Sequence, residues 1–357
     1  MQSSRAPSDG NALPVLGNSQ GTPNALTDRH ARTIRYLRVS VTDRCNYRCA
    51  YCMPTEGWAL APRAEILSLE EIVTFVGLLA EMGVERVRLT GGEPLVRRGV
   101  VELTRRIAAV PGVREVTMTT NAHLLARMAA DLRTAGLTGL NISLDSLDAT
   151  RFRTLTRGGE LDAVIQGIEA AWAAGFRGTK INAVVVAGEN HHELAELAAF
   201  CWSRELLPRF IELMPIGQLE FANPKHVFST EQILATVGKR YRLLPDGDAV
   251  IGSPRGPAKY WRVTEGSFVG RRLGVISPMS DDGFCASCNR ARLTSLGGFR
   301  PCLGNDDEVS LRDALRGGES PDQIKALIRR AVHGKLAAHN MQDAAQSPRS
   351  AMTGIGG

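Results

Sequence analysis

Three cysteines in one short segment have the spacing of a metal-binding loop. In SVTDRCNYRCAYCMP, residues 40–54, Cys45, Cys49 and Cys52 follow the pattern C-x3-C-x2-C. A zinc ion is normally held by four protein ligands, or by three and a water, and His30 is a distant candidate for a fourth. An iron–sulfur cubane held by three thiolates keeps one iron without a protein ligand, and that iron can bind a small molecule. The spacing favours such an open cluster.

A second cysteine triad lies in FCASCNRARLTSLGGFRPCL, residues 284–303. Cys285, Cys288 and Cys302 follow the pattern C-x2-C-x13-C, and no further ligand follows at a similar spacing. The remaining Cys201 lies in the apolar segment LAAFCWS, which predicts a buried structural thiol. Two open clusters in one chain imply two ligands, a cofactor on one cluster and a substrate on the other.

The elements that position these triads alternate short β-branched runs with amphipathic helical stretches, which is the pattern of β/α units around a parallel sheet. Six units of this kind favour an α/β fold with a partial (β/α)6 barrel. The strands are predicted at YLRVSV (36–41), RVRLT (86–90), EVTMTT (115–120), LNISL (140–144), KINAVVV (180–186) and RFIELM (209–214). Ser68 with Glu71, and Asn190 with Glu193, predict helix starts with reciprocal caps.

The sequence divides into four parts. Residues 1–30 are rich in Ser, Pro, Asn, Gly and Ala without periodicity, which predicts a disordered leader. Residues 31–225 form the predicted barrel, and residues 226–340 form a smaller region that carries the second cluster, covers one end of the barrel and contains a helix near 320–338. Residues 341–357 are expected to be a flexible tail ending in Gly-Gly.

Composition sets the cellular context. Seven clustered cysteines in 357 residues are a poor disulfide framework, so a reducing compartment is expected. No apolar run reaches the roughly 18 residues of a membrane span, and the N-terminus lacks the apolar core of a signal peptide. These features predict a soluble, cytoplasmic protein without a membrane partner. The net charge is +6, yet no Lys/Arg run marks a nucleic-acid surface.

Several cations lie in strands that are otherwise apolar. Arg38, Arg88 and Arg209 are within predicted strands, Lys180 begins another, and Arg290 and Arg292 follow the second triad. One strand arginine alone is usually exposed or ion-paired. A buried unpaired cation is costly, so a set that converges on one cavity requires an anion of several charges.

The first triad, with Tyr51 before Cys52, resembles the signature of the radical S-adenosylmethionine enzymes. Gly91-Gly92-Glu93-Pro94, directly after a predicted strand, resembles the cofactor-binding segment of that superfamily. The resemblance implies a partial barrel of the radical SAM type, in which S-adenosyl-L-methionine chelates the open iron of a 4Fe–4S cluster and is cleaved to a 5′-deoxyadenosyl radical.

The second triad and the CNRAR that continues it resemble the GTP 3′,8-cyclase family of molybdenum-cofactor biosynthesis, over residues 31–303 and at the terminal Gly356 and Gly357. The resemblance implies two 4Fe–4S clusters and GTP as substrate, with hydrogen abstraction at C3′ and ring closure to C8 of guanine. It implies S-adenosylmethionine contacts at Tyr51, Gly92, Ser143 and Met214. It implies nucleotide contacts at Arg38, Arg88, Thr119, Lys180, Arg209, Arg290 and Arg292. Gly356 and Gly357 are expected to reach the active site.

The resemblance also implies partners: an electron donor and, as the next enzyme, cyclic pyranopterin monophosphate synthase, with a homodimer possible. Two other functions stay open from the residues alone. One is a radical enzyme with an auxiliary cluster that acts on a peptide, and the other is a zinc-stabilised nucleic-acid-binding protein. One departure from the family pattern is Ala122 in TTNA, where glycine is usual; a positive φ at that position would strain alanine.

Overall fold

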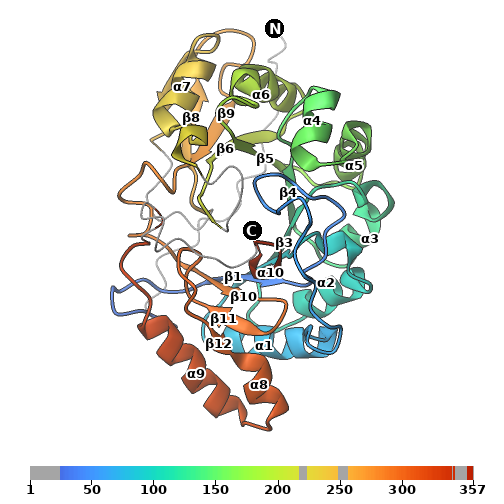
Figure 1. Ribbon diagram of the computed structural model, residues 1–357, viewed down its shortest axis with the longest axis vertical. Coiled ribbons are helices and arrows are strands. Elements are labelled where there is room, and N and C mark those ends of the chain that lie inside the picture. Colours follow the sequence, from blue (N-terminus) through green and yellow to red (C-terminus); the bar gives the residue numbers. More distant parts are fainter. Residues whose placement is uncertain (1–24, 217–222, 248–255, 340, 342–351, 357) are drawn as a thin grey trace, which may run out of the picture.

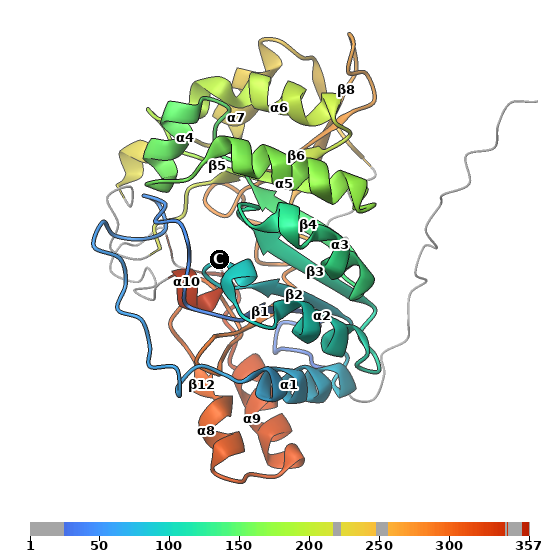
Figure 2. The same cartoon turned by 90° about the vertical axis from the view of Figure 1, so that its right-hand side faces the viewer.

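A single sheet organises the molecule. The computed structural model describes residues 25–216, 223–247, 256–339, 341 and 352–356. Within these residues, twelve strands form one sheet in the order β12-β11-β10-β1-β2-β3-β4-β5-β6-β9-β8-β7. Figure 1 shows the strands as an open arc, with helices on the outer side and the short α10 inside. Figure 2 shows the same helices stacked along the outer side of β1–β5.

The strands are β1 Tyr36–Ser40, β2 Arg86–Thr90, β3 Glu115–Thr120, β4 Gly139–Ser143, β5 Lys180–Val185, β6 Leu207–Glu212, β7 Leu243–Pro245, β8 Lys259–Val263, β9 Arg272–Ile276, β10 Arg290–Leu293, β11 Gly298–Arg300 and β12 Val309–Ser310. The α-helices are α1 Leu69–Glu81, α2 Val100–Ala108, α3 Ala129–Thr134, α4 Ala149–Thr156, α5 Leu161–Ala173, α6 Leu194–Ser203, α7 Thr230–Gly238, α8 Leu311–Arg316, α9 Pro321–His333 and α10 Met352–Ile355.

The six predicted β/α strands pair in parallel, from β1 to β6 in chain order, which confirms the partial barrel. The sequence suggested that the C-terminal region only covers one end of the barrel. The region also adds strands to the sheet of the barrel. Its β10 pairs in parallel with β1, and its β9 pairs in parallel with β6. Segments that follow the barrel in sequence therefore continue its sheet on both edges.

Alternation along the strands separates the helix-facing core from the interior of the barrel. In β1, Leu37 and Val39 are fully buried in the hydrophobic core. Arg38 lies between them in sequence and lines the central cavity. Since successive strand side chains point to opposite faces, the barrel interior receives the polar residues of each strand. This alternation is what lets strand arginines point inward.

One of the two predicted helix caps is present. The Ser68 side chain accepts from the Glu71 backbone N–H, and Glu71 accepts from that of Ser68, as a capping box. At the second, Asn190 precedes the short 3-10 helix His191–Glu193 as its N-cap residue, so the predicted start is confirmed, but the predicted side-chain cap is absent. Asn190 is buried and binds the backbone of Val186 and Asp145, so its side chain is not free to cap.

The N-terminal segment packs from Ala25 onward. Leu26 is buried in the core, and Asp28 pairs with Arg32 at 2.6 Å. Residues 25–30 therefore belong to the packed fold, although their composition groups them with the leader. Positions 1–24, and the tail except for 341 and 352–356, lie outside the described residues. No helix in the described part of the chain is long and apolar enough to cross a membrane.

Candidate active site

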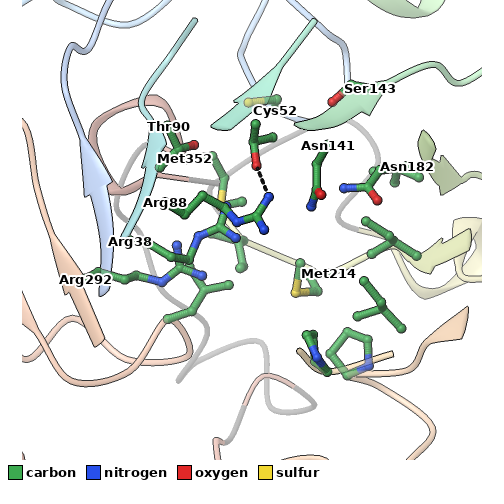
Figure 3. A pocket seen from close by; sticks show the side chains of 18 of the residues that line it. Arg38, Cys52, Arg88, Thr90, Asn141, Ser143, Asn182, Met214, Arg292 and Met352 are labelled. Atoms are coloured by element: carbon green, nitrogen blue, oxygen red, sulfur yellow. Dashed lines mark hydrogen bonds between the residues drawn. The ribbon is translucent and has the colours of Figure 1, made fainter. Parts of the chain in front are cut away.

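A cavity of about 320 Å³ opens inside the barrel. This is the size of a small-molecule site. Figure 3 shows Arg38, Arg88 and Arg292 gathered on one wall, with Cys52, Ser143 and Met214 around the same space. The cavity is lined by all six cysteines of the two triads and by Tyr51, Gly92, Thr119, Ser143, Met214, Arg38, Arg88, Arg209, Arg290 and Arg292.

The first triad lies in the loop that follows β1. Cys45, Cys49 and Cys52 are free and partly buried. Burial raises the pKa of Cys45 to about 11, and burial with the negative charge of Cys45 raises that of Cys52 to about 12. Cysteines bind a cluster as thiolates, and buried thiolates repel one another. A cationic iron core would relieve this repulsion.

The loop of the first triad is held by neighbouring backbone. The N–H groups of Arg48 and Ala50 donate to the last turn of α4, and the guanidinium of Arg157 donates to the Met53 carbonyl at 2.8 Å. Gly92 packs against the start of this loop, and a Cβ there would lie 2.2 Å from the Arg44 carbonyl oxygen. Glycine at 92 is therefore required by the loop itself, besides any ligand.

Tyr51 and Asp145 connect the first triad to the strand wall. The Tyr51 hydroxyl donates to Asp145 at 2.5 Å, and the Val184 backbone N–H donates to the same carboxylate at 2.8 Å. Burial raises the pKa of Asp145 to about 6, although both hydrogen bonds lower it. Asp145 was missed from sequence. Its place after LNIS, at the carboxyl end of a parallel strand, was the available signal.

The second triad lies in a more cationic environment. Burial raises the pKa of Cys288, but the charges of Arg290 and Lys335 outweigh it and lower the pKa to about 6. The Gly304 backbone N–H lies 3.3 Å from the Cys302 sulfur. These contacts stabilise a thiolate, which is the form that binds iron.

The donor chemistry of both triads fits iron–sulfur clusters. In a 4Fe–4S cluster each thiolate binds a different iron, so three thiols facing one cavity suffice. Over the described ranges, no three His, Cys, Asp or Glu side chains converge closely enough to share a single ion. Cys201 is fully buried in α6, as expected for a structural thiol, and lies outside the cavity lining.

Three arginines form a row across adjacent strands. Arg38 in β1 is in register with Arg88 in β2 and with Arg292 in β10. Like charges opposite each other in a sheet are destabilising, and all three are at most partly exposed. Burial, followed by the charges of Arg38 and Arg290, lowers the pKa of Arg292. Strand register therefore places three positive charges side by side at one wall of the cavity.

Two of the interior arginines donate to neutral oxygens. Arg88 donates to the hydroxyls of Tyr36 and Thr119, the latter at 3.3 Å. Arg209 donates to the Asn182 carbonyl oxygen at 3.0 Å. Neutral oxygens satisfy these hydrogen-bond donors without balancing the charge of the two guanidinium groups.

Lys180 lies apart from the cavity lining, at the start of β5. Burial, with the charges of Arg209 and Arg88, lowers its pKa to about 8. Lys180 is therefore close enough to the lining arginines to be repelled by their charges, although it does not line the cavity itself.

The C-terminal helix enters the barrel. The Gly356 carbonyl oxygen accepts from Arg38 at 3.0 Å and also from Arg292. Gly356 has φ +77°, and a Cβ there would lie 2.6 Å from the Thr90 methyl, so the position requires glycine. Gly357 lies outside the described residues.

Other lining residues were not found from sequence. Asn141 and Asn182 line the cavity, and so does Tyr36, whose hydroxyl accepts from Arg88. Each alternates with apolar neighbours in its strand, and that polar alternation was the signal that could have found them. Glu93 is also buried, accepting from Thr120 at 2.7 Å.

Two family models match consecutive parts of the chain. The Radical SAM superfamily model matches residues 39–201, and the model described as Molybdenum Cofactor Synthesis C matches residues 207–341. The GTP 3′,8-cyclase of Pseudomonas savastanoi pv. phaseolicola is 49% identical over 88% of this chain and 93% of that protein. The chain belongs to the GTP 3′,8-cyclase family. The GTP 3′,8-cyclase of Pseudomonas fluorescens is 44% identical over 89% of this chain and 94% of its own.

Solved structures support the fold of this radical SAM family. Streptococcus suis SuiB bound to S-adenosylmethionine has a TM-score of 0.55 and 17% identity, covering 84% of this chain and 69% of that chain. The expected superfamily, fold class and enzyme class are thus confirmed. The cofactors of the family, S-adenosylmethionine and two 4Fe–4S clusters, match the two triads in number and chemistry.

Proposed function

We propose that this chain converts GTP to (8S)-3′,8-cyclo-7,8-dihydroguanosine 5′-triphosphate, the first step of molybdenum-cofactor biosynthesis. One observation carries the proposal: both cysteine triads and the row of arginines open onto the same cavity. An enzyme that joins C3′ to C8 within one nucleotide needs a radical source, a base-binding site and a triphosphate site within the length of that nucleotide.

The cation row is the proposed triphosphate site. Arg38, Arg88 and Arg292 present three guanidinium groups side by side, and guanidinium binds phosphate oxygens in a bidentate way. Arg209, Arg290 and Thr119, which also line the cavity, complete the proposed nucleotide contacts, and Lys180, outside the lining, is proposed to add its positive charge to the site. In the absence of substrate the neighbouring guanidinium groups repel one another. A bound triphosphate would form ion pairs with them, and this would favour binding of the substrate.

The residues around the first triad would orient S-adenosylmethionine. Tyr51, Gly92, Ser143 and Met214 all line the cavity, as this assignment requires. When bound, the first cluster and S-adenosylmethionine supply the 5′-deoxyadenosyl radical that takes the hydrogen atom from C3′ of GTP. The chain itself fixes the nucleotide and excludes water, which is how a protein directs chemistry carried by a cofactor.

The second triad, which lines the same cavity, would hold the guanine through its open iron, with Arg290 and Arg292 beside the nucleotide. Gly356 already contacts two of the proposed phosphate ligands, Arg38 and Arg292. We infer that Gly356 and Gly357 act in ring closure, as small residues that can share a crowded cavity with the substrate.

We also infer the setting of the reaction. The product would pass to cyclic pyranopterin monophosphate synthase, an electron donor would reduce the first cluster, and the protein would act in the cytoplasm without nucleic-acid or membrane partners. A homodimer is compatible with this proposal and is tested by sedimentation.

The decisive experiment uses GTP deuterated at C3′. Reconstituted protein is incubated anaerobically with S-adenosylmethionine and a strong reductant, and the mass of 5′-deoxyadenosine is measured. Deuterium in 5′-deoxyadenosine is the expected result. Unlabelled 5′-deoxyadenosine, formed no faster than without GTP, would refute GTP as the substrate and favour a radical enzyme acting on another molecule.

A matched pair of variants tests the nucleotide site. The double substitution Arg290→Ala and Arg292→Ala should abolish GTP binding, whereas Arg114→Ala, an exposed arginine of the surface, should leave it unchanged. Unchanged binding in the double variant would refute the assigned site.

A further inference from the structure

A buried lysine lies against the second triad. Lys335 follows α9, and only 3% of it is exposed. Its ammonium group donates to the Arg290 carbonyl oxygen at 2.8 Å and lies 3.4 Å from the Cys288 sulfur. No carboxylate pairs with Lys335 among the residues that the structure describes.

The position of this lysine is fixed by a second buried cation. Arg32 donates to the carbonyl oxygens of Leu336 at 2.6 Å and Ala337 at 2.8 Å, directly after Lys335. The same guanidinium donates to the Cys285 carbonyl oxygen at 3.0 Å and pairs with Asp28 at 2.6 Å. Arg32 therefore ties the segment after α9 to the loop of the second triad.

A buried ammonium group without a carboxylate requires another anion nearby. The nearest candidate is the Cys288 thiolate, which carries negative charge when it binds iron. Hydrogen bonds to cluster sulfur and positive charge near a cluster both favour its reduced, more negative state. Lys335 supplies both at a single ligand atom.

We propose that Lys335 is a positioning residue that raises the reduction potential of the second cluster by donating a hydrogen bond to the Cys288 thiolate. The inference rests on the proposed cluster at the second triad. In the relevant step the oxidised cluster takes one electron from an external reductant, and no covalent bond forms or breaks. Loss of the ammonium group removes a contact that is stronger in the reduced state.

The test is a redox titration with dithionite, monitored by electron paramagnetic resonance. It uses the full-length chain with Cys45, Cys49 and Cys52 replaced by alanine, so that the second triad alone binds iron. Lys335→Met should lower the equilibrium constant for one-electron reduction by about tenfold, equivalent to about 59 mV. Lys335→Gln, which keeps a donor without the charge, should give a smaller shift, and Lys335→Arg should restore most of the wild-type potential.

Lys325→Met is the matched control. Lys325 is on α9 itself and pairs with Glu81 of α1, so its loss removes a lysine charge away from the triad. It should leave the potential unchanged. Equal potentials in all three Lys335 variants and the parent, with about four irons bound to each, would overturn the inference. If Lys335→Met fails to retain iron, the other two variants provide the test: the potential of Lys335→Gln should lie below that of Lys335→Arg, and equal potentials would overturn the inference. A parent that binds no iron at the second triad would refute the proposed cluster and, with it, this role.

Discussion

At the scale of single residues, Ala122 is held in a conformation that suits glycine. Its φ is +62°, in the left-handed region, and it is fully buried. A Cβ on Gly167 of α5 would lie 2.4 Å from the Ala122 carbonyl oxygen, so the two backbones are packed closely. The surroundings impose this conformation, and alanine carries about 1–2 kcal/mol of strain there.

Ala122→Gly should therefore be close to neutral. The strain relieved is offset by the backbone entropy of glycine, about 0.4–1 kcal/mol, and by one lost buried methyl, about 0.8 kcal/mol. Ala171→Gly, at an equally buried position in α5 with ordinary helical φ, lacks the relief and should lose 1–2 kcal/mol more. Chemical denaturation of both variants measures the difference. Equal losses would mean that Ala122 is not strained.

At the scale of elements, one buried carboxylate joins three of them. Glu212, the last residue of β6, accepts from the backbone N–H of Thr230 at 2.7 Å, where α7 begins. It also accepts from the N–H groups of Met279 and Ser280, at 2.9 and 3.0 Å, in the loop after β9. A fully buried carboxylate with this many donors fixes the end of β6, two residues before Met214.

Glu212→Gln should destabilise the protein by about 2–3 kcal/mol, because an amide turns one N–H₂ group toward backbone donors and leaves them unsatisfied. S-adenosylmethionine binding should weaken as Met214 moves. Thermal unfolding and isothermal calorimetry measure the two effects. Glu196→Gln, on an exposed pair with Arg240, is the control and should change stability by less than about 0.5 kcal/mol. A neutral Glu212→Gln would show that the hydrogen bonds rearrange.

The start of β5 carries a pH-dependent effect. The pKa of Lys180 is about 8 in the folded protein, against a usual value of 10.5, because of burial and the charges of Arg209 and Arg88. Between these values the unfolded chain binds a proton that the folded chain has lost, so stability from this group rises with pH. Below pH 8 Lys180 is protonated in both states, so the folded state is destabilised by the full free-energy cost of burying this positive charge near Arg209 and Arg88.

Lys180→Met should accordingly stabilise the ligand-free protein at pH 7, by at least about 1 kcal/mol, and the gain should shrink as the pH rises toward 10.5. The same variant should bind GTP more weakly at pH 7. Melting temperatures from pH 7 to 10 give the first result, and equilibrium dialysis the second. Lys239→Met, at an exposed lysine after α7, should show neither trend. A pH-independent difference would contradict the assigned pKa.

At the scale of the whole molecule, local patterns predicted the six parallel strands of the barrel and missed the strands that extend its sheet at both edges. The β-branched runs RVRLT and EVTMTT match β2 and β3 residue for residue, because strand propensity and alternation are local. The cysteine spacings likewise identified both triads. By contrast, the pairing of β10 with β1 joins Arg292 to Arg38 across most of the chain, and nothing in either segment encodes that register. The side-chain cap expected of Asn190 is absent for a related reason, since its amide donates to the Asp145 carbonyl oxygen of a distant segment.

The C-terminal helix offers a test at this scale. Removal of residues 352–357 should leave the sheet and the iron content intact, because the buried residues of α10, Thr353 and Ile355, lie outside the main hydrophobic core cluster. It should free the Arg38 and Arg292 contacts that Gly356 now occupies, so GTP should still bind. Formation of the cyclised product should be lost. Circular dichroism, iron analysis and product detection by mass check the three expectations. A truncated protein that still cyclises GTP would remove the terminal glycines from the mechanism.

The pairing of the first barrel strand with a late one also governs how the protein is made. As the chain leaves the ribosome, β1 can pair with β2 early, but its other edge stays open until β10 is synthesised. An unpaired strand edge is a site for association with other chains, and contacts of long sequence separation form slowly. A nascent chain that stalls before residue 290 therefore presents an open edge beside the loop of the first triad, at the stage when it is most exposed to aggregation.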